Sequence, residues 1–182
     1  MKRFFLLLLA LVGFSCLSCS GESLLVSVQS TPYDHQMTRI RPILTAQNQQ
    51  GDGQVSLRLV NHWIGDLRCI PYGFTAVWKT PTETKSGDPA DCKAKAVALY
   101  ELMKQHGARQ IRLVIGRRTT SSRSTHAWVE WQTDGSTYVL DPTINWMAYR
   151  SGDLDPRSYI PYYEFAGAKK YRAASSTLVA AN

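Results

Sequence analysis

The sequence predicts an α+β domain in which helices are followed along the chain by a small antiparallel sheet. Apolar residues recur at helical spacing between residues 55 and 106. Beyond residue 110 the pattern changes to short apolar or alternating runs, and Asp134-Gly135 between two of them is a strong hairpin signal. The 182 residues are 44% hydrophobic and 19% charged, so one packed domain of ordinary size is expected.

The N-terminus has the form of a secretory signal. Lys2-Arg3 precedes the apolar run Phe4–Leu11, which is shorter than the roughly 20 residues that span a bilayer. Residues 1–19 are therefore interpreted as a signal peptide. Leu17-Ser18-Cys19 loosely resembles the end of a bacterial lipoprotein signal, which makes Cys19 a candidate for lipidation. A lipoprotein, a plainly secreted protein and one with an uncleaved anchor all lie outside the cytoplasm, in the periplasm or anchored to a membrane.

The charge balance does not indicate a nucleic-acid partner. The formal net charge is +7, but the Lys and Arg residues are dispersed along a chain with an export signal. The densest cluster, Arg117-Arg118 with Arg123, lies in a Thr/Ser-rich stretch and is interpreted as solvated loop charge or as a rim facing a substrate. No glycine-rich phosphate loop occurs, and no cofactor is expected.

The composition divides the chain after the signal into three parts. Residues 20–53 are rich in Ser, Thr, Gln, Asn and Gly, and are interpreted as a linker or N-terminal extension with one strand at Leu24–Val28. The folded domain is expected over residues 54–172. Residues 173–182 are expected to form a flexible tail.

Three helical segments are expected in the first half of the domain. The first begins near Val55 and ends at Cys69-Ile70-Pro71-Tyr72-Gly73. Thr80-Pro81-Thr82-Glu83 has the form of a capping box and predicts one short helical turn ending near Gly87. Asp88-Pro89 is expected to open a stronger helix that runs to His106 and is closed by Gly107.

Three strands are expected after the helices. They are Ile111–Ile115, Thr125–Trp131 and Thr137–Asp141, the last two joined by the Asp134-Gly135 turn. The remainder from Pro142 is rich in Tyr and Pro and is expected to wrap the sheet as irregular structure.

Two cysteines, Cys69 and Cys92, remain after the signal. Export permits a disulfide between them. The alternative is that one of them is a working thiol. Cys92 lies in the first turn of a predicted helix, where free amides and the helix dipole favour a thiolate, although the neighbouring Asp91 opposes it.

The predicted hairpin brings a base and its orienting group together. If Asp134-Gly135 is a two-residue turn, Thr133 pairs with Ser136, and His126 and Asp141 become diagonal neighbours on one face of the sheet. Diagonal neighbours are within side-chain reach, so Asp141 can hold one ring nitrogen of His126 and leave the other for a thiol. A register slip of one residue would separate them.

Cys92, His126 and Asp141 each lie within a longer motif. The motifs are, in chain order, Gly87-Asp88-Pro89-Ala90-Asp91-Cys92-Lys93-Ala94-Lys95-Ala96, Thr125-His126-Ala127-Trp128-Val129-Glu130-Trp131 and Tyr138-Val139-Leu140-Asp141-Pro142. These three ordered motifs resemble those of the transglutaminase-like superfamily, most of all the bacterial transglutaminase-like cysteine proteinases. The segment from Val77 to Thr84 is also similar, and the resemblance covers about half the chain. It implies a papain-like α+β core with a Cys-His-Asp triad.

The resemblance assigns roles to four residues. It implies that Cys92 is the nucleophile, His126 the general base and acid, and Asp141 the group that orients His126. The backbone N–H of Cys92 would be one oxyanion donor. The indole N–H of Trp78 is a candidate for the second, and the alternative for Trp78 is a core aromatic residue.

No metal site is expected. The histidines form neither an H-x₃-H nor an H-E-x-x-H pattern, and no C-x-x-C pair follows the signal. Some members of the resembled family bind calcium through acidic residues that flank the cysteine. Here Asp91 precedes Cys92 but Lys93 follows it, and a cation beside a calcium ligand is unfavourable, so no calcium is expected at this position.

The sequence therefore favours an exported thiol acyl-transfer enzyme that hydrolyses peptide or amide bonds of envelope proteins. The partner is then a protein or peptide substrate in the cell envelope. Two alternatives stay open: a protein-glutamine transglutaminase, in which a lysine replaces water as acyl acceptor, and a non-catalytic binding module of the envelope. The same triad serves both enzymes, so the motifs do not separate them.

Overall fold

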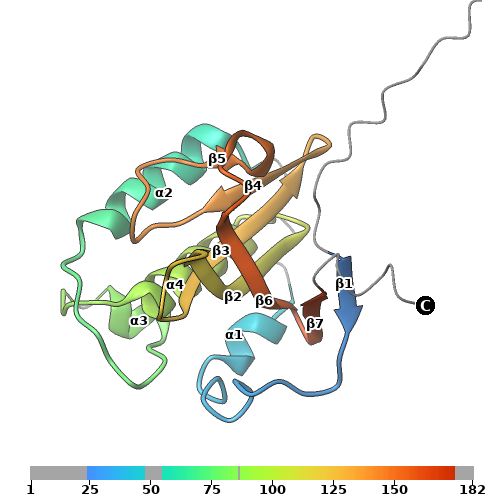
Figure 1. The fold of residues 1–182 in the computed structure, drawn as a ribbon. Coiled ribbons are helices and arrows are strands. Elements are labelled where there is room, and N and C mark those ends of the chain that lie inside the picture. The colour runs from blue at the N-terminus through green and yellow to red at the C-terminus, as the bar shows by residue number, and fades with distance from the viewer. Residues whose placement is uncertain (1–23, 48–54, 86, 175–182) are drawn as a thin grey trace, which may run out of the picture.

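The computed structural model describes residues 24–47, 55–85 and 87–174. Within them an antiparallel sheet of seven strands has the order β1-β7-β6-β2-β3-β4-β5, with the helices packed beside it (Figure 1). The predicted α+β class is confirmed. The strands are β1 (Leu24–Ser27), β2 (Ile111–Thr119), β3 (His126–Thr133), β4 (Ser136–Leu140), β5 (Tyr149–Arg150), β6 (Ser158–Ala166) and β7 (Lys169–Ala174). The helices are α1 (Arg41–Thr45), α2 (Leu57–Cys69), α3 (Pro81–Thr84) and α4 (Cys92–Gln105), with the 3₁₀ turn η1 (Ser151–Asp153).

The central strands are buried on both faces. Leu113 and Val129 belong to the main core cluster, which they share with buried residues of α2 and α4. Val114 and Trp128 belong to a second cluster with Val139 and Tyr159. Successive side chains of a strand point to opposite faces, so the two clusters lie on opposite sides of the sheet. Burial on both sides explains why these strands look continuously apolar in the sequence.

The helices α2 and α3 follow the sequence pattern. On α2 the residues Val60, Ile64 and Leu67 are buried, and the Ser56 side chain accepts the Leu59 N–H as a cap. The short α3 begins with the predicted capping box, in which the Thr80 hydroxyl accepts the Glu83 N–H and the Glu83 carboxylate accepts the Thr80 N–H.

The helix α4 begins three residues later than expected. Asp91, not Asp88-Pro89, caps it: the Asp91 carboxylate accepts the Ala94 N–H at 3.1 Å. Cys92 is the first residue of the helix, so it lies in the first turn as predicted. The C-terminal end agrees with the prediction, because the helix ends at Gln105 and Gly107 has φ +83°.

The β3–β4 hairpin has the predicted register. Thr133 pairs with Ser136 and Val129 with Leu140. Asp134 and Gly135 have φ of +49° and +70°, as a two-residue type I′ turn requires. This register brings the start of β3 beside the residue that follows β4.

The expectation of irregular structure after Pro142 is wrong. The strand β6 lies inside the sheet, hydrogen-bonded to β2 on one side and to β7 on the other. Tyr and Phe favour strands, and the nine residues of β6 include four of them, but Pro161 interrupts the pattern that would have revealed it. Pro161 is accommodated where the pairing with β2 shifts between Ile115 and Gly116. Ala173 and Ala174 pair with β1, so the tail does not begin at residue 173.

The N-terminal extension packs on the domain instead of leading freely to it. The strand β1 lies at residues Leu24–Ser27, close to the expected Leu24–Val28, and pairs with β7 at the edge of the sheet. Met37, Ile40 and Leu44 are buried in the main core. The signal segment 1–19 with Cys19 lies outside the described residues. Among the described helices, none is long and apolar enough to cross a membrane.

Candidate active site

Cys92 occupies the first position of α4, where the backbone amides have no partner within the helix. Its side chain is buried, with 9% of the residue exposed, and its thiol is free. Cys69 is also a free thiol and is exposed at the end of α2, so the disulfide alternative is not realised in the structure.

The carboxylate of Asp91 does not present a free negative charge to Cys92. It accepts the N–H groups of Ala94 and Thr75, the latter at 3.2 Å, and pairs with the ammonium of Lys93. Only 1% of the Asp91 side chain is exposed. The repulsion between Asp91 and a Cys92 thiolate, expected from the sequence, is therefore largely offset by the charge of Lys93.

His126 contacts Asp141 at 2.7 Å between Nε2 and Oδ2. Asp141 directly follows β4 and His126 opens β3, so the hairpin register produces the contact that was expected from the sequence. With Nε2 directed at Asp141, the Nδ1 atom of the same ring is left for another partner. Both side chains are enclosed, with exposures of 11% for His126 and 0% for Asp141.

The electrostatics of His126 link all three residues. Burial alone would lower the pKa of His126, but hydrogen bonds to Asp141 and Cys92, together with the charges of both groups, raise this pKa to about 9. The imidazolium form is thus favoured between an anionic carboxylate and the cysteine sulfur. Cys92, His126 and Asp141 form one connected chain of side chains.

Trp78 is the fourth residue singled out from the sequence. Its ring is 2% exposed and belongs to the same core cluster as Cys92. Its indole Nε1 is buried and has no hydrogen-bond partner among the described residues. A buried donor without an acceptor costs roughly 1–3 kcal/mol, so a fixed unpaired indole N–H is an uncommon feature for a plain core aromatic.

Tyr159 completes the surroundings of Asp141 and was missed by the sequence analysis. Its hydroxyl donates to Asp141 Oδ2 at 3.0 Å and accepts the Asn145 side-chain amide at 3.0 Å. The Thr143 N–H donates to the other oxygen, Oδ1, at 2.9 Å. Tyr159 has φ +50°, a left-handed conformation that is strained for a tyrosine. No local signal could have found it, because it reaches Asp141 from the unpredicted strand β6.

Lys95 was also missed, one helical turn after Cys92. It is 2% exposed, and its ammonium donates to the Ile70 carbonyl at 2.6 Å, at the end of α2. Burial and the charge of Arg68 lower the pKa of Lys95, whereas the charge of Asp141 acts in the opposite direction. The Lys95 amine is therefore buried within electrostatic reach of Asp141.

The residues around Cys92 do not fit a calcium ion. Calcium takes six to eight oxygen ligands. Asp91 is the acidic residue that flanks Cys92, and its carboxylate is already taken up by Lys93 and two backbone amides. In the described part of the chain no three His, Cys, Asp or Glu side chains gather as a metal site would require.

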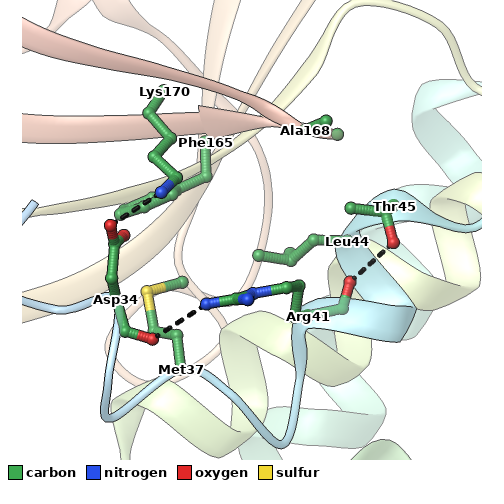
Figure 2. A pocket seen from close by; sticks show the side chains of 9 residues that line it. Asp34, Met37, Arg41, Leu44, Thr45, Phe165, Ala168 and Lys170 are labelled. Carbon is green, nitrogen blue, oxygen red and sulfur yellow. Dashed lines mark hydrogen bonds and ion pairs between the residues drawn. The ribbon is translucent and has the colours of Figure 1, made fainter. Parts of the chain in front are cut away.

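A cavity of about 220 Å³ lies elsewhere, between the N-terminal extension and the β6–β7 turn (Figure 2). Its charged groups are already engaged with one another. Lys170 pairs with Asp34 at 2.7 Å, and the Arg41 guanidinium donates to the Asp34 carbonyl at 3.4 Å. Lys170 joins β7 to the extension in this way, so these contacts serve to anchor the extension.

The comparisons with known proteins support the fold. No family model matches the sequence, and no curated protein matches it. Solved structures of Legionella pneumophila LapG are similar. An EGTA-treated form has a TM-score of 0.56 at 14% identity over 80% of each chain. A calcium-bound form has a TM-score of 0.52 at 13% identity, over 81% of this chain and 85% of LapG. LapG has a transglutaminase-like fold, and the chain shares that fold.

Proposed function

We propose that the chain is a cysteine peptidase or amidase that acts through a Cys92–His126–Asp141 triad. The observation that carries the proposal is the position of His126, which bonds Asp141 through Nε2 and interacts with Cys92. A nucleophile, its base and a group that orients the base are the parts that covalent acyl transfer needs. The sequence motifs resemble those of cysteine proteinases, and the fold neighbours are cysteine proteases of transglutaminase-like fold.

The proposed reaction begins with attack of the Cys92 sulfur on a peptide or amide carbonyl carbon. The negative charge that develops on the carbonyl oxygen is stabilised by the Cys92 backbone N–H and the unpaired indole N–H of Trp78. His126 then gives its proton to the leaving amine as the C–N bond breaks, which leaves a thioester. His126 next removes a proton from water as the water oxygen attacks the thioester carbon. The C–S bond then breaks, which releases the carboxylic acid, and His126 returns the proton to the Cys92 sulfur.

Hydrogen bonds hold the Asp141 carboxylate in one geometry. Three donors fix its two oxygens, so its position is determined before a substrate arrives. The Asp141–Nε2 contact holds the ring with Nδ1 towards Cys92 and stabilises the imidazolium.

The acceptor of the acyl group separates hydrolysis from cross-linking. We favour water, because the motifs resemble the proteinase branch of the superfamily. A primary amine added to the reaction distinguishes the two: hydrolysis predicts a free carboxylic acid as the main product, and cross-linking predicts the amide of the added amine.

We also propose that the enzyme acts outside the cytoplasm. Fractionation of cells that express Cys19→Ala tests the lipid anchor, because loss of lipidation shifts the protein from the membrane to the soluble fraction.

The two free thiols make a direct test possible within one molecule. Iodoacetamide is added to the purified full chain between pH 5 and pH 9, and labelling of each cysteine is followed by mass spectrometry. Cys92 is expected to react faster than Cys69 at pH 6, although Cys92 is buried and Cys69 exposed. His126→Ala should slow Cys92 by about tenfold or more and leave Cys69 unchanged. Equal slow labelling of both thiols at pH 6 would contradict the proposal and favour a binding module.

A further inference from the structure

The segment from Ile70 to Lys79, here called the strap, lies against the residues that lead into Cys92. The Pro71 carbonyl accepts the Ala90 N–H at 2.9 Å, and the Gly73 N–H donates to the Ala90 carbonyl at 3.4 Å. The ammonium of Lys79 donates to the Pro89 carbonyl at 3.0 Å. The strap is therefore hydrogen-bonded along its length to the chain directly ahead of the nucleophile.

A charged clamp fixes the middle of the strap. The Lys93 ammonium donates to the Thr75 carbonyl at 2.9 Å and pairs with Asp91, whose carboxylate accepts the Thr75 N–H. Gly73 allows the close approach, because a Cβ there would lie 2.4 Å from the Pro89 Cβ. The strap backbone is thus held at a set position relative to α4.

This well-held backbone presents apolar side chains to solvent. Phe74 is 78% exposed, Tyr72 61% and Val77 49%, and no large hydrophobic side chain in the described residues is more exposed than Phe74. The Phe74 ring is itself placed, because the Lys93 ammonium lies 5.0 Å from its centroid. Exposed apolar side chains on a backbone that is held in place are typical of a binding surface, since little conformational entropy is lost when a ligand covers them.

The surface lies at the nucleophile. Tyr72 directly precedes Gly73, and the Gly73 N–H donates to the carbonyl of Ala90. Ala90 lies two residues before Cys92. The pKa of the Tyr72 hydroxyl is raised by burial and by the charges of Cys92 and Asp91, in agreement with this proximity. A substrate whose carbonyl reaches the Cys92 sulfur therefore comes close to the segment that carries Tyr72 and Phe74.

We propose that Tyr72 and Phe74 form the specificity surface for apolar side chains on the acyl side of a peptide substrate. This inference rests on the proposed function of Cys92. An extended peptide with apolar side chains buries the exposed rings and gains hydrophobic free energy, whereas a polar peptide of the same size does not. The substrate class is thus a peptide segment with apolar residues on the acyl side of the bond that is broken.

Two peptidyl chloromethyl ketones of equal length test the inference on the full chain. One is acetyl-Leu-Leu-Gly-chloromethyl ketone and the other acetyl-Asn-Asn-Gly-chloromethyl ketone, which differ in polarity but little in size. Iodoacetamide reports the reactivity of Cys92 without a peptide. The leucine probe is expected to alkylate Cys92 about tenfold faster than the asparagine probe, as partial burial of two leucines implies.

The variants locate the preference. The double variant Tyr72→Ser with Phe74→Ser should bring the ratio of the two peptide rates close to one and leave the iodoacetamide rate unchanged within about twofold. Tyr149→Ser is the matched control, because Tyr149 is also an exposed tyrosine, 40% accessible, but lies on the edge strand β5. It should leave the ratio unchanged.

The outcomes separate the two proposals. Equal peptide rates in the wild-type chain, with fast iodoacetamide labelling of Cys92, would overturn the specificity surface and leave the enzyme proposal intact. A preference for leucine that survives in the double variant would assign the selectivity to another surface and would overturn the inference as well. Slow iodoacetamide labelling of Cys92 would instead overturn the proposed function.

Discussion

Replacing Tyr159 by phenylalanine tests how firmly Asp141 is held. The fully buried Asp141 carboxylate accepts hydrogen bonds from His126, Tyr159 and Thr143. The substitution deletes one of the three donors. It keeps the aromatic ring, which packs edge-on against Trp128 with centroids 5.4 Å apart. The φ of +50° is strained for phenylalanine as for tyrosine, so the comparison isolates the hydroxyl.

The magnitude follows from the charge of the acceptor. A hydrogen bond to a charged group contributes roughly 1.5–3 kcal/mol, and the Asn145 amide also loses its acceptor. We expect the free energy of unfolding to fall by about 2 kcal/mol, which lowers Tm by about 4–8 °C for a domain of this size. With one donor fewer, the carboxylate charge acts more strongly on His126, so the pKa of His126 should move upward from about 9.

Urea denaturation measures the first effect, and the pH dependence of Cys92 alkylation by iodoacetamide measures the second. Tyr162→Phe is the control on the same strand, because its ring lies over Arg117 and a phenylalanine preserves that contact. The control should match the wild-type chain in both assays. Equal unfolding free energies and superimposable pH profiles for Tyr159→Phe and the wild-type chain would refute the argument that the hydroxyl holds Asp141.

Three further predictions concern His126, Trp78 and Gly116. Because the pKa of His126 rises from 6.5 to about 9 on folding, its stabilisation should be complete below about pH 6.5 and disappear as the pH rises through 9. The free energy of unfolding, measured by urea denaturation, should therefore fall by at most about 3 kcal/mol over this pH range. If the same fall with pH persists in His126→Gln, it does not come from His126. Trp78→Phe should weaken the binding of the peptide aldehyde acetyl-Leu-Leu-glycinal by about tenfold or more, because the adduct of this aldehyde with Cys92 places an oxyanion at the site. Unaltered binding would exclude the indole N–H as a donor to the oxyanion. Gly116→Ala should destabilise the fold by about 3 kcal/mol or more, because its Cβ would lie 2.1 Å from the Ile160 carbonyl oxygen. Gly65→Ala is the control: the space around Gly65 is open, so this variant should stabilise α2 by about 0.5–1 kcal/mol. Comparable stabilities of the two variants would contradict the close packing at Gly116.

The parts of the fold that local patterns determine were predictable. The β3–β4 hairpin depends on a two-residue turn, and Asp134-Gly135 specifies that turn and therefore the register. The contact between His126 and Asp141 follows from the register alone. The most important geometric element of the candidate site was thus accessible from the sequence.

The parts that long-range pairing determines were not predictable. The strand β6 gains its place inside the sheet from pairing with β2, which is distant in the sequence, and Pro161 interrupts the local pattern that would have revealed the strand. Tyr159 was lost with it. The start of α4 was misplaced for a different reason: Asp88 and Asp91 are both acceptable caps, and the bond from Thr75 and the ion pair with Lys93 favour Asp91 only in the folded chain.

The ion pair between Lys93 and Asp91 has a consequence for how the protein responds to its surroundings. A dissolved cation that neutralised Asp91 would obey mass action, and its occupancy would rise and fall with its concentration. The Lys93 ammonium is part of the chain, so its local concentration is set by a covalent tether and does not change with the medium. Lys93 also holds the strap through the Thr75 carbonyl, so we expect a chelator to leave the position of the strap unchanged.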